Sequence, residues 1–159
     1  MTFAVRTLQS VSQVQIARYW RLYITANNGS SDGYTSVQEL ELRNAAGVDQ
    51  TSPGMSSNQS DYFYGSPAAN TIDNNTTDYV NSTWVSGTTS GDHWLSVDLG
   101  APKDVAQLAL LCQAYASGPS RAPKDFLLQR SDNGSTWTTV LTVTNATGYV
   151  VGAYKTFTL

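Results

Sequence analysis

The chain has 159 residues, of which 40% are hydrophobic, 11% are aromatic and only 13% are charged, and its formal net charge is −3. A chain of this length buries roughly 70% of its extended surface on folding, so one domain forms without a disulfide or metal scaffold. The aromatic content and low net charge exclude a disordered chain, and the acidic balance argues against a partner that is nucleic acid or an anionic membrane surface.

Residues of alternating polarity predict β-strands along most of the chain. The first strand covers residues 18–25 and ends at an Asn-Asn-Gly turn, while residues 7–16 favour extended structure over a short helix. The other expected strands are residues 36–43, 93–99, 105–112, 125–130, 137–143 and 154–159. An Asp-Asn-Gly turn at residues 132–134 joins two of them as a hairpin. Short strands separated by Gly, Asn and Ser turns predict an all-β jelly-roll sandwich.

Residues 51–91 form a long segment that is poor in apolar alternation. Long segments of this kind are either ordered functional loops or disordered. The segment contains several aromatic residues, which favour order, namely Tyr62, Phe63, Tyr64, Tyr79 and Trp84. A functional site is therefore expected in this part of the chain.

Apolar side chains inside the strand motifs are assigned to the core. Cys112 is the only cysteine and ends an apolar run, so it is expected to be a buried strand residue, and neither an intramolecular disulfide nor a multi-cysteine zinc site forms. Trp94 and Trp137 lie inside strand motifs and are also expected in the core, whereas Trp20 fits either the core or a sheet face.

The chain shows neither a targeting segment nor a catalytic motif. Residues 1–6 lack the apolar stretch of a secretory signal, and no apolar run approaches the ~18 residues of a membrane span. The Asn-X-Ser/Thr sites are therefore attributed to polar loops rather than to glycosylation. No nucleophile elbow, zinc-protease His pair, phosphate loop or Cys-x-x-Cys motif occurs, so we expect a non-enzymatic protein made in the cytoplasm from a bacterial or phage gene.

Three motifs resemble one known family. They are Ser-Pro-Ala-Ala-Asn-Thr-Ile-Asp-Asn-Asn at residues 66–75, Trp-Leu-Ser-Val-Asp-Leu-Gly at 94–100 and Ser-Asp-Asn-Gly-Ser-Thr-Trp at 131–137. This set is similar to the discoidin, or coagulation factor 5/8 type C, domains, whose galactose-binding-like fold also includes carbohydrate-binding modules. The resemblance implies one discoidin-like sandwich domain over residues 17–159, with residues 1–16 as an N-terminal arm or extra strand.

The order of the motifs differs from that of the family. The family ends with an Arg-Tyr-x-Arg strand and an Ala-Glu-Leu-x-Val strand, which resemble residues 18–21 and 38–42 here, near the beginning of the chain. The resemblance therefore implies a circular permutation, in an order similar to that of phage virion proteins. Because termini of sandwich strands often lie close together, a permutation costs little, and we expect residues 18–26 to pair close to residues 154–159.

The family commonly holds a structural Ca²⁺, and the resemblance places its ligands here. Asp73 corresponds to the family's loop Asp, Asn75 to the residue that follows it, and Glu39 to the Glu of the closing strand. The implied set of side-chain and backbone oxygens is Asp73, Glu39, Asn75, Asp78, Asn70 and Gln38. Calcium prefers six to eight such oxygens.

Two alternatives to this ligand set remain open. The family's Thr position falls on Asp78 and its Trp on Val80, but a four-residue insertion instead makes Ser82 and Trp84 the counterparts. The other alternative is a hydrogen-bonded turn rich in Asn and Asp that holds no ion.

Recognition of a sugar requires an aromatic face for the ring and planar polar groups for the hydroxyls. Residues of the inter-strand segments, which gather at one end of the sandwich, are the candidates for this role. They are Trp84, His93, Tyr115, Arg121, Tyr62 and Tyr64. For His93 a surface position is favoured over a role as metal ligand or base, and for Arg121 a pair with Asp125 is the structural alternative.

These expectations lead to a non-enzymatic carbohydrate-binding or adhesion module, carried on the tail fibre or head surface of a phage virion and contacting host surface glycans. The alternative is a structural virion protein, such as a capsid decoration or tail-assembly protein, which uses the same fold for protein contacts and residues 1–17 as an attachment arm. A secreted bacterial module is a weaker alternative. Because a shallow sugar site is weak alone, we expect a homo-oligomer, such as a trimer, or many copies on a particle.

Overall fold

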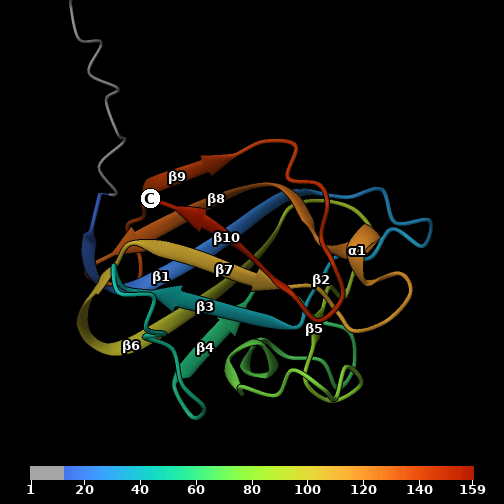
Figure 1. Cartoon of the computed structure of the whole chain (residues 1–159), viewed down its shortest axis with the longest axis horizontal. Helices are drawn as coiled ribbons and strands as arrows, with labels where there is room; N and C mark the ends of the chain where they lie inside the picture. The colour runs from blue at the N-terminus through green and yellow to red at the C-terminus, as the bar shows by residue number, and fades with distance from the viewer. Residues whose placement is uncertain (1–12) are drawn as a thin grey trace, which may run out of the picture.

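The computed structural model describes residues 13–159, which are almost entirely β-structure (Figure 1). In chain order the elements are β1 (Gln15–Asn27), β2 (Ser36–Val37), β3 (Glu39–Arg43), β4 (Ser56–Gln59), the 3-10 helix η1 (Ala68–Ile72), β5 (Trp84–Val85), β6 (His93–Val105), β7 (Gln107–Leu111), α1 (Gly118–Arg121), β8 (Pro123–Ser131), β9 (Thr138–Val143) and β10 (Tyr154–Thr158). None of the helices in this described part is long and apolar enough to cross a membrane.

The strands form two main antiparallel sheets. A five-stranded sheet has the order β4-β6-β1-β8-β9, a three-stranded sheet has the order β10-β7-β3, and β2 pairs with β5 beside them. The two main sheets pack face to face, since Phe126 of β8 meets Phe157 of β10 edge to face with 5.1 Å between ring centroids. The prediction of an all-β sandwich is confirmed.

Strand β1 shows how the sequence alternation builds the core. Trp20, Leu22 and Ile24 are buried, while Arg21 and Tyr23 between them face outward. An irregularity between Ala17 and Tyr19 shifts the register of β1 against β6 by three residues, and Ala17 and Trp20 on either side of it are both buried. Trp20, for which the sequence left two positions open, therefore lies in the core.

The alternation of β6 contradicts one expectation about tryptophan. Leu95, Val97 and Leu99 are buried, so Trp94 faces outward and is only partly buried. Trp137 precedes β9 and is also partly exposed, with the Arg21 guanidinium carbon 4.4 Å from its ring centroid. The prediction that Trp94 and Trp137 are core residues is wrong. Cys112, by contrast, is buried as expected.

The two ends of the described chain meet, although not as predicted. The backbone N–H of Gln13 donates to the carbonyl of Leu159 at 2.9 Å. Strand β10 nevertheless pairs with β7 in the three-stranded sheet, while β1 lies in the five-stranded sheet, so the predicted pairing of residues 18–26 with 154–159 is wrong. Circular permutation stays an expectation. Of the expected arm, residues 1–12 lie outside the described residues, and Gln15 and Ile16 belong to β1.

Candidate functional site

Loops at one end of the sandwich enclose a groove of about 250 Å³, which we call the loop-end groove. It lies at the end of the molecule that carries α1, to the right in Figure 1. Aromatic, aliphatic and polar side chains from four loop regions and from β5 line it: Tyr34, Phe63, Ser66, Tyr79, Val80, Val85, Gln113 and Arg121.

Aromatic rings form the walls of the loop-end groove. Tyr34 and Phe63 meet edge to face with 5.7 Å between ring centroids. Tyr79 stacks on Tyr115 at 5.6 Å with an angle of 28° between the ring planes. Phe63 and Tyr115 are each about half exposed. The groove therefore offers ring surface that is held in place by other rings yet open to solvent.

Arg121, the last residue of α1, supplies the positive charge of the groove. Its guanidinium forms an ion pair with Asp32, and Nη1 donates to the Gln113 side-chain oxygen at 3.3 Å. Its guanidinium carbon also lies 5.8 Å from the Tyr34 ring centroid. The hydrogen bond from Arg121 lowers the pKa of Asp32 to about 2. Arg121 therefore pairs with Asp32 and not with Asp125, which was the structural alternative.

Asp61 anchors the loop that carries Phe63. Its carbonyl accepts a hydrogen bond from Trp84 Nε1 at 2.9 Å, and its carboxylate accepts one from Thr88 Oγ1 at 2.8 Å. The same carboxylate lies 3.2 Å from His93 Nδ1. These contacts join the loop to β5 and β6, so Phe63 is presented from a fixed base.

Two predicted ligand-binding residues belong to this base. Trp84 is 0% exposed and His93 is 3% exposed, and their rings meet edge to face. The prediction that Trp84 offers its face to a ligand is wrong, because the indole is enclosed by the core. His93 lies in β6 and not on the surface. It borders a separate polar cavity of about 260 Å³ with Thr35 and Ser90.

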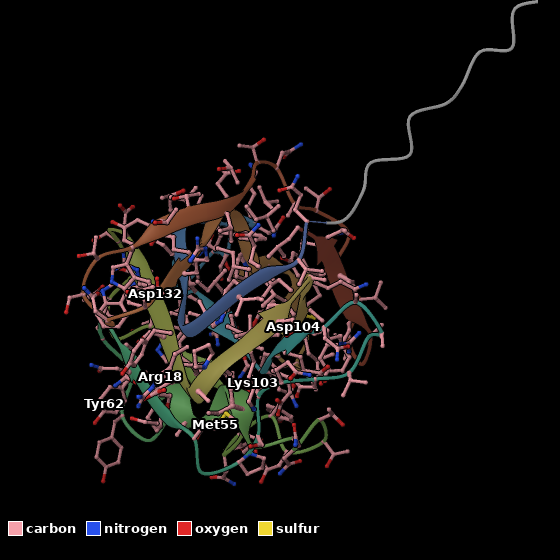
Figure 2. The ribbon with its side chains drawn as sticks, turned by 90° about the vertical axis from the view of Figure 1, so that its left-hand side faces the viewer. Arg18, Met55, Tyr62, Lys103, Asp104 and Asp132 are labelled. Carbon is pink, nitrogen blue, oxygen red and sulfur yellow. The ribbon has the colours of Figure 1, made fainter. Side chains whose placement is uncertain are left out.

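Of the remaining predicted ligand-binding residues, two lie at the loop-end groove and two lie away from it. Arg121 lines the loop-end groove, and Tyr115 stands beside it through its stack on Tyr79. Tyr62 and Tyr64 are exposed, Tyr64 by 95%, but neither lines the groove, and Tyr62 lies at the periphery of the molecule in Figure 2.

Sequence reasoning did not select several residues of the groove. They are Tyr34, Phe63, Tyr79 and Gln113. Phe63 and Tyr79 carried a signal, since both are aromatic residues of the long segment that precedes β6.

A second polar cluster lies between β3 and η1. Glu39 is fully buried, and neither of its carboxylate oxygens has a hydrogen-bond partner. Burial, together with the neighbouring carboxyl group of Asp73, raises the pKa of Glu39 to about 8. A buried carboxyl group that lacks a hydrogen-bond donor and lies beside a second carboxyl group favours a bound cation or a proton.

The turn after η1 determines which oxygens remain for a cation. Asp73 Oδ1 accepts the N–H of Asn75 at 2.8 Å, and Asn74 has a φ of +60°, a left-handed conformation that Asn tolerates. The side-chain oxygens of Asn75 and Asp78 accept backbone N–H groups of their own turns. Both side chains therefore already have hydrogen-bond partners in the turn, unlike the Glu39 carboxylate, and their predicted role as ligands stays a prediction.

The other two predicted ligands hold this region together. Gln38 donates through its side chain to the carbonyl of Asn75 at 3.3 Å, and Asn70 donates to the carbonyl of Thr83 at 3.2 Å. Ser82 and Trp84 are both buried. Their burial favours the alternative in which a four-residue insertion places them, and not Asp78 and Val80, at the family's Thr and Trp positions.

The residues present fit a calcium ion. Two carboxylates, with the unpartnered oxygens of Glu39 between η1 and β3, match the hard oxygen ligands that Ca²⁺ takes. Residues 13–159 contain no group of three or more His, Cys, Asp or Glu side chains placed to hold a metal. Backbone carbonyls and water would therefore complete the coordination.

Comparison with known proteins gives one finding for this chain. A family model described as a NedA-like, galactose-binding domain of the F5/F8 type C group matches residues 70–159, which is more than half of the chain. No curated protein matches the sequence. The matched part includes Asp73 and Arg121, while Tyr34, Glu39 and Phe63 precede it.

Proposed function

The chain belongs to the NedA-like galactose-binding domains of the F5/F8 type C family, and on that premise we propose that it is a non-enzymatic carbohydrate-binding module whose sugar site is the loop-end groove. The observation that carries the proposal is the combination of ring surface from Phe63 and Tyr79 with the polar groups of Arg121 and Gln113 in one groove. A sugar presents C–H surface on its faces and hydroxyls at its edges, and this groove offers a partner for each.

The fixed positions of the groove residues support specificity for the shape of a sugar. Arg121 is held by Asp32 and Gln113, so the guanidinium does not swing freely when a ligand arrives. Phe63 stands on the loop that Asp61 anchors. A groove whose polar and aromatic groups are already positioned loses less side-chain entropy on binding.

Calcium has a structural role in this proposal. Glu39 and Asp73 would hold the ion, with backbone carbonyl oxygens as further ligands. The ion would neutralise the buried Glu39 carboxylate and the partly buried Asp73 carboxylate and so fix η1 against β3. Since the loop-end groove takes Tyr79 from the segment that follows η1, this would hold one wall of the groove in place.

The proposed biological role is adhesion to host surface glycans from a phage virion, where many copies act together. The open groove supports weak single-site binding, and weak sites suit repeated display. The competing role is that of a structural virion protein. The exposed aromatic run of residues 62–64 favours that role, since contiguous exposed apolar surface is typical of protein contacts.

A glycan array probed with a multimeric form of the full chain tests the proposal. The informative variant is Phe63→Ala, and Tyr64→Ala is its matched control because Tyr64 is exposed but does not line the groove. We expect Phe63→Ala to weaken glycan binding at least tenfold and Tyr64→Ala to leave it unchanged. Failure of every glycan to bind, or equal loss in both variants, would contradict the groove as a sugar site and favour the structural role.

A further inference from the structure

The outer face of the five-stranded sheet carries a second group of aromatic and polar side chains. Because β1 alternates, Tyr19, Arg21 and Tyr23 all point away from the core, and β6 adds Trp94, Ser96 and Asp98 on the same face. None of these outward side chains is aliphatic. The face lies on the sheet and not among the loops of the loop-end groove, so it is a separate surface.

A shallow hollow of about 180 Å³ opens on this face. The rings of Tyr19 and Trp137 and the polar groups of Asn58 and Ser96 line it. Gly134 closes one side, where a Cβ atom would lie 3.5 Å from the Tyr19 ring. Arg18 of β1 and Asp132 of the β8–β9 turn lie at the same side of the molecule in Figure 2.

The negative charge of the hollow is already compensated. Asp98 lines it, and Arg18 donates to both of its carboxylate oxygens at 2.7 and 2.8 Å. The Tyr23 hydroxyl holds Asp92 farther along the face at 2.9 Å. Asp132 is largely exposed and lies 4.0 Å from Arg130. The hollow therefore does not repel an anion through an unpaired carboxylate at its wall.

Arg21 is the uncompensated charge on this face. Its Nε donates to the neutral side chain of Gln129 at 2.8 Å, and among residues 13–159 no carboxylate forms an ion pair with it. The guanidinium stacks over Trp137 at 4.4 Å and lies 5.5 Å from the Tyr23 ring centroid. Its cross-strand neighbour Ser96 lines the hollow, so the guanidinium borders it.

Within the described residues, the Arg21 guanidinium donates a hydrogen bond only through Nε, and its two terminal nitrogens donate none. Burial lowers the pKa of Arg21, but an arginine remains charged at neutral pH. The two terminal nitrogens are therefore charged donors fixed in direction by the Trp137 stack and the Gln129 hydrogen bond. This is the geometry that receives a planar carboxylate through two parallel N–H groups.

We propose that the outer face of the five-stranded sheet binds an acidic glycan, with a sugar carboxylate on Arg21 and the sugar ring in the hollow between Tyr19 and Trp137. Asn58 and Ser96 supply polar groups for the hydroxyls. A net charge of −3 and a single uncompensated arginine disfavour a nucleic acid, which needs a basic surface.

Titration of the full chain with an oligogalacturonide, a neutral galactose oligomer of equal length, a sulfated galactose oligomer and a single-stranded oligonucleotide tests this site. We expect the oligogalacturonide to bind at least tenfold more tightly than the other three probes, with NMR shifts at the Trp137 indole. Arg21→Gln should reduce that binding at least tenfold, and Arg21→Lys should restore only part of it, since an ammonium lacks the paired donors of a guanidinium.

Arg43→Gln is the matched control. Arg43 also stacks on a ring, that of Tyr154, but it pairs with Glu41 and lies in the three-stranded sheet. Binding of the acidic probe should survive this change, and it should also survive Phe63→Ala, which separates the sheet-face site from the loop-end groove. Equal binding of neutral and acidic oligomers, preference for the sulfated oligomer or the oligonucleotide, or unchanged binding by Arg21→Gln would overturn the proposal.

Discussion

Asp32 and Arg121 lie 89 residues apart in the chain and form an ion pair at the rim of the loop-end groove. Asp32 comes from the β1–β2 loop and Arg121 ends α1 just before β8, so the pair joins two loops that extend from the paired strands β1 and β8. The pair fixes the guanidinium, and it also makes the groove sensitive to acid.

Stability should depend on pH through Asp32. Its pKa falls from an ordinary 3.8 to about 2 in the folded state, so its contribution is fully present above about pH 4 and is lost as the pH falls to about 2. Asp32→Asn should therefore melt at a lower temperature than the unmodified chain at pH 6 and at nearly the same temperature at pH 2. Asp132→Asn is the control, because Asp132 is largely exposed. A difference in melting temperature between the unmodified chain and Asp32→Asn that stays constant from pH 6 to pH 2 would contradict the role of Asp32 in stability.

Calcium should raise the melting temperature if Glu39 and Asp73 hold the ion. A ligand that binds only the folded state adds about 4 kcal/mol at 1,000 times its Kd, and EDTA should remove this gain. Glu39→Gln and Asp73→Asn should abolish the calcium response. Asp78→Asn should preserve it, because that carboxylate serves its own turn. A melting temperature that neither calcium nor EDTA changes would argue for a proton between the two carboxyl groups instead of an ion.

Gly118 should resist replacement. A Cβ atom at this position would clash with the backbone oxygen of Gln113, so the loop that carries Gln113 and Arg121 would have to move. We expect Gly118→Ala to cost about 1–3 kcal/mol of unfolding free energy and to weaken sugar binding in the groove. The neighbouring Ser117→Ala is the control, since its buried hydroxyl has no partner to lose. Denaturant unfolding of both variants measures the difference, and equal stability would contradict the close approach.

Binding to host cells should depend on the number of copies. A single open sugar site with a Kd near ~1 mM corresponds to only about −4 kcal/mol, and display of several copies raises the avidity by roughly 10² to 10⁴. Comparison of a monomer with an engineered trimer in a cell-attachment assay measures this gain. Nanomolar attachment by the monomer would show that one site suffices.

The alternation of polar and apolar residues along the strands was enough to predict the sandwich. It also contained information about which side chains face outward, and that information was not used. In β6 the inward phase of Leu95, Val97 and Leu99 already places Trp94 on the outer face. The expectation of a buried Trp94 rested on its place inside a strand motif and did not use the phase of the alternation, which decided its position.

The positions of Trp84 and Glu39 depend on contacts between segments far apart in the sequence. Trp84 follows a polar segment without periodicity, and its burial comes from β2, which pairs with β5, and from the Asp61 loop. Glu39 alternates with Leu40 and Leu42, so a solvent-facing side chain was equally compatible with the pattern. Its burial follows from the packing of η1 on β3, which no local pattern encodes.

The hydrogen bond between Gln13 and Leu159 also fixes how the module points when it is tethered. The C-terminus, to which Gln13 is hydrogen-bonded, lies at the left of Figure 1, whereas α1, whose Arg121 lines the loop-end groove, lies at the right. The two ends of the described chain therefore lie at the same pole of the module. The groove lies at the opposite pole, so a carrier attached directly at either of these two residues would leave the groove open.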